Sequence, residues 1–176
     1  LSVEDIIGAN PIDSSWLNVA EYVRYIQEGR DITHYKTPFQ IAEEMKKSGN
    51  KALELINSME PSNPTLQNEI ADIKAWSYLS LYFEKKLRGC IAFEKFRVTN
   101  NTAFQNEADA NLEEALDYWK KVIEVTNPYF DEIPLLHLKD NYISADFEET
   151  INKFSWEALL KQVERDIDYV KNYVLE

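Results

Sequence analysis

A long segment almost free of helix-breaking residues most constrains the fold of this chain. Between Pro64 and Asn100 there is no proline and only one glycine, Gly89. Apolar side chains recur there at the three- and four-residue steps of a helix: Leu66, Ile70, Ile73, Trp76, Leu79, Phe83, Leu87, Ile91 and Phe96. Other apolar residues lie off this stripe. The segment therefore predicts one helix from Thr65 to about Val98, roughly 50 Å long and packed on several sides.

Gly89 has two interpretations. In a continuous helix, its missing side chain lets a neighbouring helix or an aromatic ring approach the backbone. Alternatively, the chain folds back between Lys86 and Gly89, and the spacing from Trp76 to Phe96 then matches much of a tetratricopeptide repeat. No period of about 34 residues continues on either side, although such repeats need neighbours to bury a core. We therefore expect the continuous helix and keep the repeat as the alternative.

Residues 1 to 15 are predicted to be an irregular leading segment with one short turn. A helix follows, carries apolar residues from Trp16 to Ile26, and ends at Gly29. Its cap is one of three adjacent polar residues: Asp13, Ser14 and Ser15.

Proline and glycine mark the next helix. Thr37 caps it and Pro38 begins it, and its apolar stripe continues to about Ser58. Gly49 predicts a kink or a close contact in its middle. Asn63 or Ser62 is the candidate cap of the long helix, with Pro64 at its first position.

Two more helices are predicted after the long one. Asn100-Asn101-Thr102 breaks the long helix and caps the next one, which stops at Asn127-Pro128, and Ser155 caps the last helix. Residues 128 to 154 read as an irregular loop, which is uncommon inside a compact domain unless it covers something.

These patterns predict an all-α protein. We expect an antiparallel bundle of four to five helices around the long central one, in a single domain spanning residues 1–176. An apolar fraction of 44% over 176 residues is enough for a real core. The chain begins at Leu1 rather than at a methionine. We interpret it as a fragment of a longer polypeptide or as a processed form.

Net charge argues against nucleic acid as a partner. Thirty-one acidic and 19 basic side chains give a formal charge of -12, which repels a phosphate backbone. The basic groups Lys85-Lys86-Arg88 and Lys46-Lys47 are short and are predicted to be solvated helix edges. No run of about 18 apolar residues occurs, so no membrane span is expected.

Motifs for catalysis, cofactors and metals are absent from the sequence. Cys90 has no disulfide partner and is expected to be an inert core thiol, and with only His34 and His137 there is no zinc set. No glycine-rich phosphate loop or serine nucleophile motif occurs. Three adjacent carboxylate pairs are predicted to be surface groups: Glu43-Glu44, Glu113-Glu114 and Glu148-Glu149.

Aromatic residues supply the remaining candidates, because flat rings with polar tips also stack on sugars. Four are assigned to the core: Trp76, Phe83, Phe104 and Trp119. Five cluster around the first helix and the loop after it, and are candidate contacts to a glycan or a neighbouring domain: Trp16, Tyr22, Tyr25, His34 and Tyr35. Arg24 and Arg88 are candidates for ion pairs with acids.

Three stretches carry a resemblance to a known group of proteins: DIKAWSYLSLYFEKKLRGCIAFEKF, TPFQIAEEMKKSGNKALELI and FSWEALLKQVERDIDYV. From about Trp16 onward the chain resembles the helical domain of Bacteroidetes-type multidomain glycoside hydrolases, which include α-glucuronidase-like and carbohydrate-binding family 6 proteins. The resemblance implies a periplasmic or extracellular location and a catalytic domain on other residues. No catalytic motif of that family matches a position here.

The first hypothesis is therefore a noncatalytic accessory or scaffold domain of a bacterial polysaccharide-degrading glycoside hydrolase, in contact with a neighbouring domain of the same polypeptide. The second is a tetratricopeptide-like module that binds a protein partner. No cofactor is expected in either case.

Overall fold

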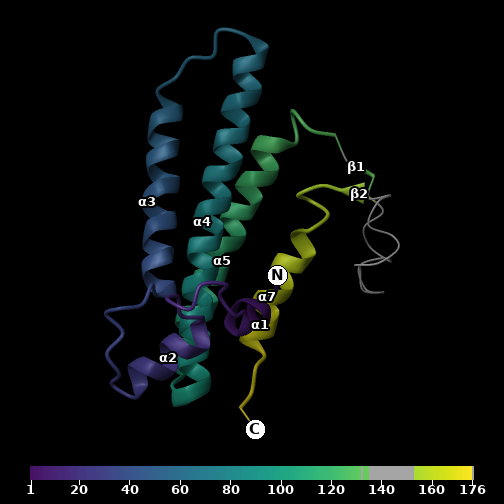
Figure 1. Cartoon of the computed structure of the whole chain (residues 1–176). Coiled ribbons are helices and arrows are strands. Elements are labelled where there is room, and N and C mark those ends of the chain that lie inside the picture. The colour runs from purple at the N-terminus through teal and green to yellow at the C-terminus, as the bar shows by residue number, and fades with distance from the viewer. Residues whose placement is uncertain (132, 135–152, 176) are drawn as a thin grey trace.

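The computed structural model describes residues 1–131, 133–134 and 153–175, and these form an all-α fold (Figure 1). The helices are α1 (Val3–Gly8), α2 (Val19–Gln27), α3 (Pro38–Asn57), α4 (Pro64–Thr99), α5 (Thr102–Thr126) and α7 (Leu160–Lys171). Two short strands, β1 (Ile133–Pro134) and β2 (Lys153–Phe154), pair antiparallel. Most of the predicted loop 128–154 lies outside the described residues.

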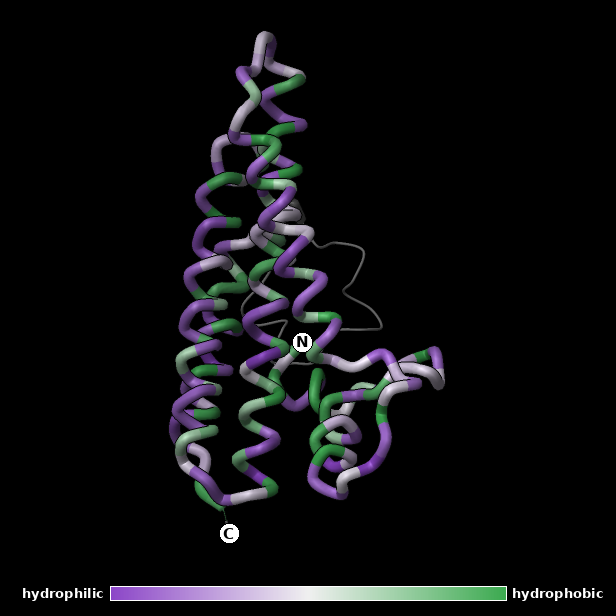
Figure 2. The backbone as a smooth tube through the Cα atoms, turned by 90° about the vertical axis from the view of Figure 1, so that its left-hand side faces the viewer, coloured by the Kyte–Doolittle hydropathy of each residue, from purple (hydrophilic) through white to green (hydrophobic). Residues whose placement is uncertain are grey.

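The long helices form the predicted antiparallel bundle around a central helix. Figure 1 shows α4 between α3 and α5, with α7 running beside α5. Helices α1 and α2 pack against the C-terminal half of α4. The tip of the α3–α4 hairpin stands beyond the end of α5 in both Figure 1 and Figure 2.

Helix α4 is continuous over 36 residues, which makes it about 54 Å long. Of the two candidate caps it is Asn63 whose side chain accepts from the Leu66 N–H, and Pro64 occupies the first turn as predicted. Asn100 ends the helix in the left-handed conformation, with φ of 54°. The segment from Lys86 to Gly89 is helical, so the hairpin turn required by the tetratricopeptide alternative does not exist there.

Gly89 marks a close approach between two helices. A Cβ atom at this position would lie 3.0 Å from Cγ of Leu112 and 3.3 Å from the carbonyl oxygen of Ala108. Gly49 does the same between α3 and α4, where a Cβ would lie 3.0 Å from the Ser77 carbonyl oxygen. Both glycines therefore let neighbouring helices pack with little space between their backbones.

The amino-terminal region differs from prediction. The expected short turn is the helix α1, whose Val3 and Ile7 are buried in the core. The caps proposed at Asp13 to Ser15 are wrong, because α2 begins at Val19 behind Asn18. The backbone just before it, from Trp16 to Asn18, is extended: the Leu17 N–H donates to the Lys36 carbonyl at 3.0 Å, which prevents an earlier helix start.

Other helix ends agree more closely with prediction. Gly29 follows α2 with φ of 66°, a conformation that favours glycine. Thr37 caps α3 through the Gln40 N–H, and Pro38 begins it. The Ser155 hydroxyl accepts from the Ala158 N–H, but it caps a run of turns, and α7 itself begins only at Leu160.

Of the aromatic residues assigned to the core, Trp119 is buried and Trp76 is not. Trp119 is 6% exposed, and its indole N–H donates to the Trp156 carbonyl at 2.9 Å. Trp76 is 71% exposed, so its assignment to the core is wrong. Trp76 lies in the N-terminal half of α4. Helices α1 and α2 pack only against the C-terminal half and therefore do not cover its side chain.

Adding one methyl group at Gly89 tests how tightly α4 and α5 pack. Alanine favours helix over glycine by about 1 kcal/mol, but overpacking against a buried leucine costs about 1 to 3 kcal/mol. We expect Gly89→Ala to lower the free energy of unfolding in urea by about 1 kcal/mol. Gly8→Ala is the control, since nothing lies within 4 Å of its Cβ position. A more stable Gly89→Ala protein would contradict the close packing.

Candidate functional site

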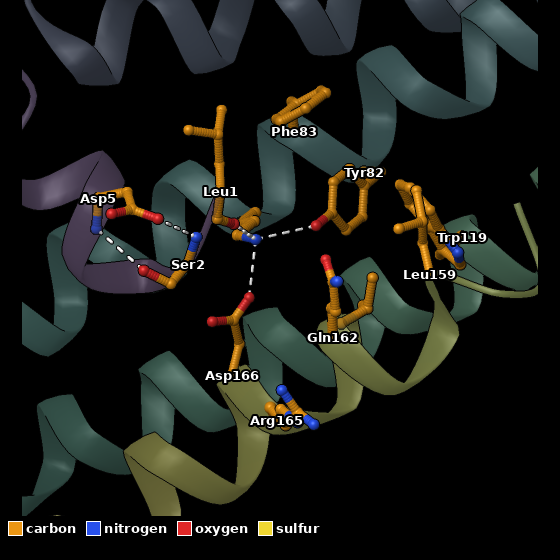
Figure 3. Close-up of a pocket in the computed structure, with 12 residues that line it drawn as sticks. Leu1, Ser2, Asp5, Tyr82, Phe83, Trp119, Leu159, Gln162, Arg165 and Asp166 are labelled. Atoms are coloured by element: carbon orange, nitrogen blue, oxygen red, sulfur yellow. Dashed lines mark hydrogen bonds and ion pairs between the residues drawn. The ribbon is translucent and has the colours of Figure 1, made fainter. Parts of the chain in front are cut away.

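A buried lysine joins three parts of the chain that are far apart in sequence. Lys86 and Tyr82 lie one turn apart on α4, and Asp166 lies on α7 (Figure 3). The backbone of Leu1 and Val3 completes the group. We call these residues the Lys86 cluster.

Each proton of the Lys86 ammonium has an acceptor. Its Nζ lies 2.7 Å from Asp166 Oδ2 and donates to Tyr82 Oη at 3.0 Å. The third acceptor is the Leu1 carbonyl oxygen. The other oxygen of Asp166 accepts from the Val3 N–H at 3.0 Å. The cluster therefore fixes the start of α1 against α4 and α7.

Burial and charge together set the protonation of this cluster. Lys86 is 3% exposed, and such burial by itself lowers the pKa of an amine. Tyr82 and Asp166 more than offset that effect, so the pKa of Lys86 is raised above its ordinary value. Burial also raises the pKa of Tyr82, against the opposing effect of the ammonium. Lys86 is thus a charged structural group rather than a neutral amine nucleophile.

The assignment of Lys86 to a solvated helix edge is wrong. Its neighbours fit that prediction better, since Lys85 pairs with Glu114 at 2.6 Å and Arg88 pairs with Glu84 and Glu43. A signal for the buried pair is present in the sequence. Lys86 shares its helix face with Tyr82 and Cys90, four residues to either side, and Asp166 sits directly beside Ile167 on the apolar face of α7.

The predicted aromatic residues are only partly brought together. Trp16 is 42% exposed, and the bridge between Trp16 and Lys36 brings its segment alongside the one that carries Tyr35. The Tyr25 and Tyr35 rings pack edge to face, with 6.2 Å between their centroids, and His34 is exposed. Tyr22 instead packs against the core.

Arginines accompany Tyr25. The Arg30 guanidinium lies 4.5 Å from the Tyr25 ring centroid, and Arg24 lies at 5.3 Å. Within the described residues, Arg24 has no carboxylate partner, whereas Arg88 forms the ion pairs predicted for it.

We call Trp16, Tyr25, His34 and Tyr35 the Trp16–Tyr35 surface.

Reactive groups outside these clusters are inert or paired. Cys90 is fully buried, and burial raises the pKa of its thiol to about 12. Of the three predicted carboxylate pairs, Glu43-Glu44 and Glu113-Glu114 are exposed and form ion pairs with lysines or an arginine. The third, Glu148-Glu149, lies outside the described residues. Over the described ranges, no three or more His, Cys, Asp and Glu side chains form a metal-binding group.

Breaking the buried ion pair should be costly. Lys86→Met leaves Asp166 buried without its cation, so we expect the free energy of unfolding to fall by about 3 to 5 kcal/mol. Lys86→Met/Asp166→Leu should recover part of that loss. Lys85→Met removes a more exposed pair and should cost less than about 1 kcal/mol. Urea unfolding followed by circular dichroism measures all three, and equal losses for the two single lysine variants would exclude the cluster.

Alkaline pH should weaken the wild-type protein through the same group. Because the folded pKa of Lys86 is raised, its stabilising effect is complete below the ordinary value of 10.5 and is lost as pH rises through the higher folded pKa. Above pH 10.5 the unfolding free energy of the wild type should fall more steeply than that of Lys86→Met/Asp166→Leu. Parallel curves would show that Lys86 does not titrate differently on folding.

Comparison with known proteins adds no assignment. No protein-family model, curated protein or solved structure matches this chain. Among the described residues, no helix is both long and apolar enough to cross a lipid bilayer.

Proposed function

We propose that this chain is a noncatalytic accessory domain of a bacterial polysaccharide-degrading glycoside hydrolase. The observation that carries the proposal is the state of its buried polar groups. In the described part of the chain, each buried charged side chain has an ion-pair partner: Glu84 pairs with the partly exposed Arg88, and Lys86 pairs with Asp166. Groups so committed hold a fold together and are poorly placed for acid–base chemistry.

Glycoside hydrolysis needs a different arrangement. Two carboxyl groups must flank the scissile bond at roughly 5 to 10 Å, one of them able to give up a proton. Several exposed acids of the described helices are paired with lysines or arginines on the surface, as in Glu44 with Lys36 and Glu113 with Lys171. The resemblance to the helical domains of glycoside hydrolases supports the same assignment.

The Trp16–Tyr35 surface is the part of the domain best suited to contact a glycan. It combines an indole that is 42% exposed with two tyrosine rings and an exposed histidine. Such rings offer apolar faces to sugar C–H groups and polar tips to hydroxyls. The tetratricopeptide alternative has no comparable support, because α4 is unbroken where the repeat needs its turn.

Two assays on the purified chain test the proposal. No turnover is expected on uronic-acid or neutral glycosides, and robust turnover would refute the noncatalytic role. The chain should be retained on insoluble xylan or cellulose, and Trp16→Ala should weaken that retention severalfold because it removes the exposed indole.

Trp76→Ala is the matched control for this assay. Trp76 is also exposed, at 71%, but it lies on α4, away from the Trp16–Tyr35 surface. It should leave retention unchanged. Equal weakening by both substitutions, or no retention of the wild type, would contradict the role of this surface in binding glycan.

A further inference from the structure

A pocket of about 610 Å³ lies beside the Lys86 cluster. Figure 3 shows it between α4, α7 and the amino-terminal residues, with Trp119 of α5 at one side. Its volume is within the usual range for small-molecule sites, roughly 300 to 1,000 Å³. The Trp16–Tyr35 surface contributes no residue to its lining.

The charges that line this pocket balance. Its ionisable side chains are two acids and two bases: Asp5, Asp166, Lys86 and Arg165. The three protons of the Lys86 ammonium already have acceptors, and Asp5 accepts from the Ser2 N–H at 2.7 Å. Arg165 has no ion-pair partner among the described residues, but it is exposed, as is Asp5, so water screens both of these charges. The buried part of the lining holds only the mutually neutralised pair of Lys86 and Asp166. The electrostatics favour a neutral ligand.

Two neutral polar groups in the pocket have bonding capacity left. The Tyr82 hydroxyl accepts from Lys86, but within the described residues its own proton has no acceptor. Tyr82 is 3% exposed, and burying such a donor unpaired is costly. The Gln162 carboxamide likewise has no hydrogen bond to any described residue, and Figure 3 shows it directed toward the space beside Tyr82. The pocket thus offers a hydroxyl donor and an amide that both donates and accepts.

The rest of the wall is apolar. Phe83 is partly exposed, and the apolar surface continues through Leu159, just before α7, and Val163 on α7. The Trp119 N–H is already bonded to the Trp156 carbonyl, so only the carbon atoms of its ring are available to a ligand. A ligand that fits must present C–H groups to these residues and hydroxyls to Tyr82 and Gln162.

We propose that this pocket binds one neutral sugar unit. Its hydroxyls bond the Tyr82 hydroxyl and the Gln162 carboxamide, and its C–H groups pack against Phe83 and Trp119. The inference goes beyond the proposed function, because the pocket and the Trp16–Tyr35 surface share no residue.

Titration of the ¹⁵N-labelled chain with glucose, xylose, mannose and galactose tests this inference. At least one of these sugars should bind saturably in the millimolar range, with amide shift changes centred on Tyr82, Phe83 and Gln162. Glucuronic acid and glucose 6-phosphate serve as anionic probes and should bind more weakly. Gln162→Met keeps the length of the side chain, removes its polar atoms and should weaken sugar binding about tenfold, the effect of about 1.4 kcal/mol.

Gln67→Met is the control, because Gln67 is exposed near the start of α4 and does not line the pocket. It should leave the affinity unchanged. Lack of saturable binding by every neutral sugar, tighter binding of the anionic probes, or full affinity in Gln162→Met would overturn the inference. Shift changes confined to Trp16 and Tyr35 would also overturn it, while supporting the proposed function, so the two failures are distinguishable.

Discussion

The fold depends on covering one long helix whose apolar residues face several directions. Helix α4 cannot bury that surface against a single partner, so α3 and α5 flank it along most of its length and α1 and α2 cover its C-terminal half. Gly49 and Gly89 allow this arrangement, because each removes a side chain where two helices come closest. The rest of the architecture follows from which sides of α4 are covered and which are left open.

The Lys86 cluster ties the ends of the chain to this centre. The Lys86 ammonium bonds side chains of α4 and α7 and the backbone before α1. Apolar packing is not directional and would not by itself fix the position of these three segments relative to one another. A buried ion pair adds little net stability but strongly disfavours arrangements that separate its members. The same commitment leaves Lys86 without a free proton to offer, and the neutral groups beside it therefore decide what the neighbouring pocket accepts.

Much of the fold was predictable because its signals are local. The caps at Thr37 and Asn63, each followed by proline, act within one helical turn and mark the helix starts wherever the helices pack. The continuity of α4 follows from a lack of breakers, and the packing role of Gly89 was one of two readings of the sequence. The candidate pocket was not predictable, because its residues come from α4, α5, α7 and the leading segment.

The sequence by itself determined the all-α class, the long central helix and most helix ends, since capping and periodicity are properties of neighbouring residues. Only the tertiary structure decided that Lys86 is buried and Trp76 exposed, because burial depends on which helix lies over a side chain rather than on the side chain itself. It also moved the start of α2 to Val19, where pairing of Leu17 with Lys36 holds the preceding backbone extended. Contacts between distant segments outweigh local preference at these positions.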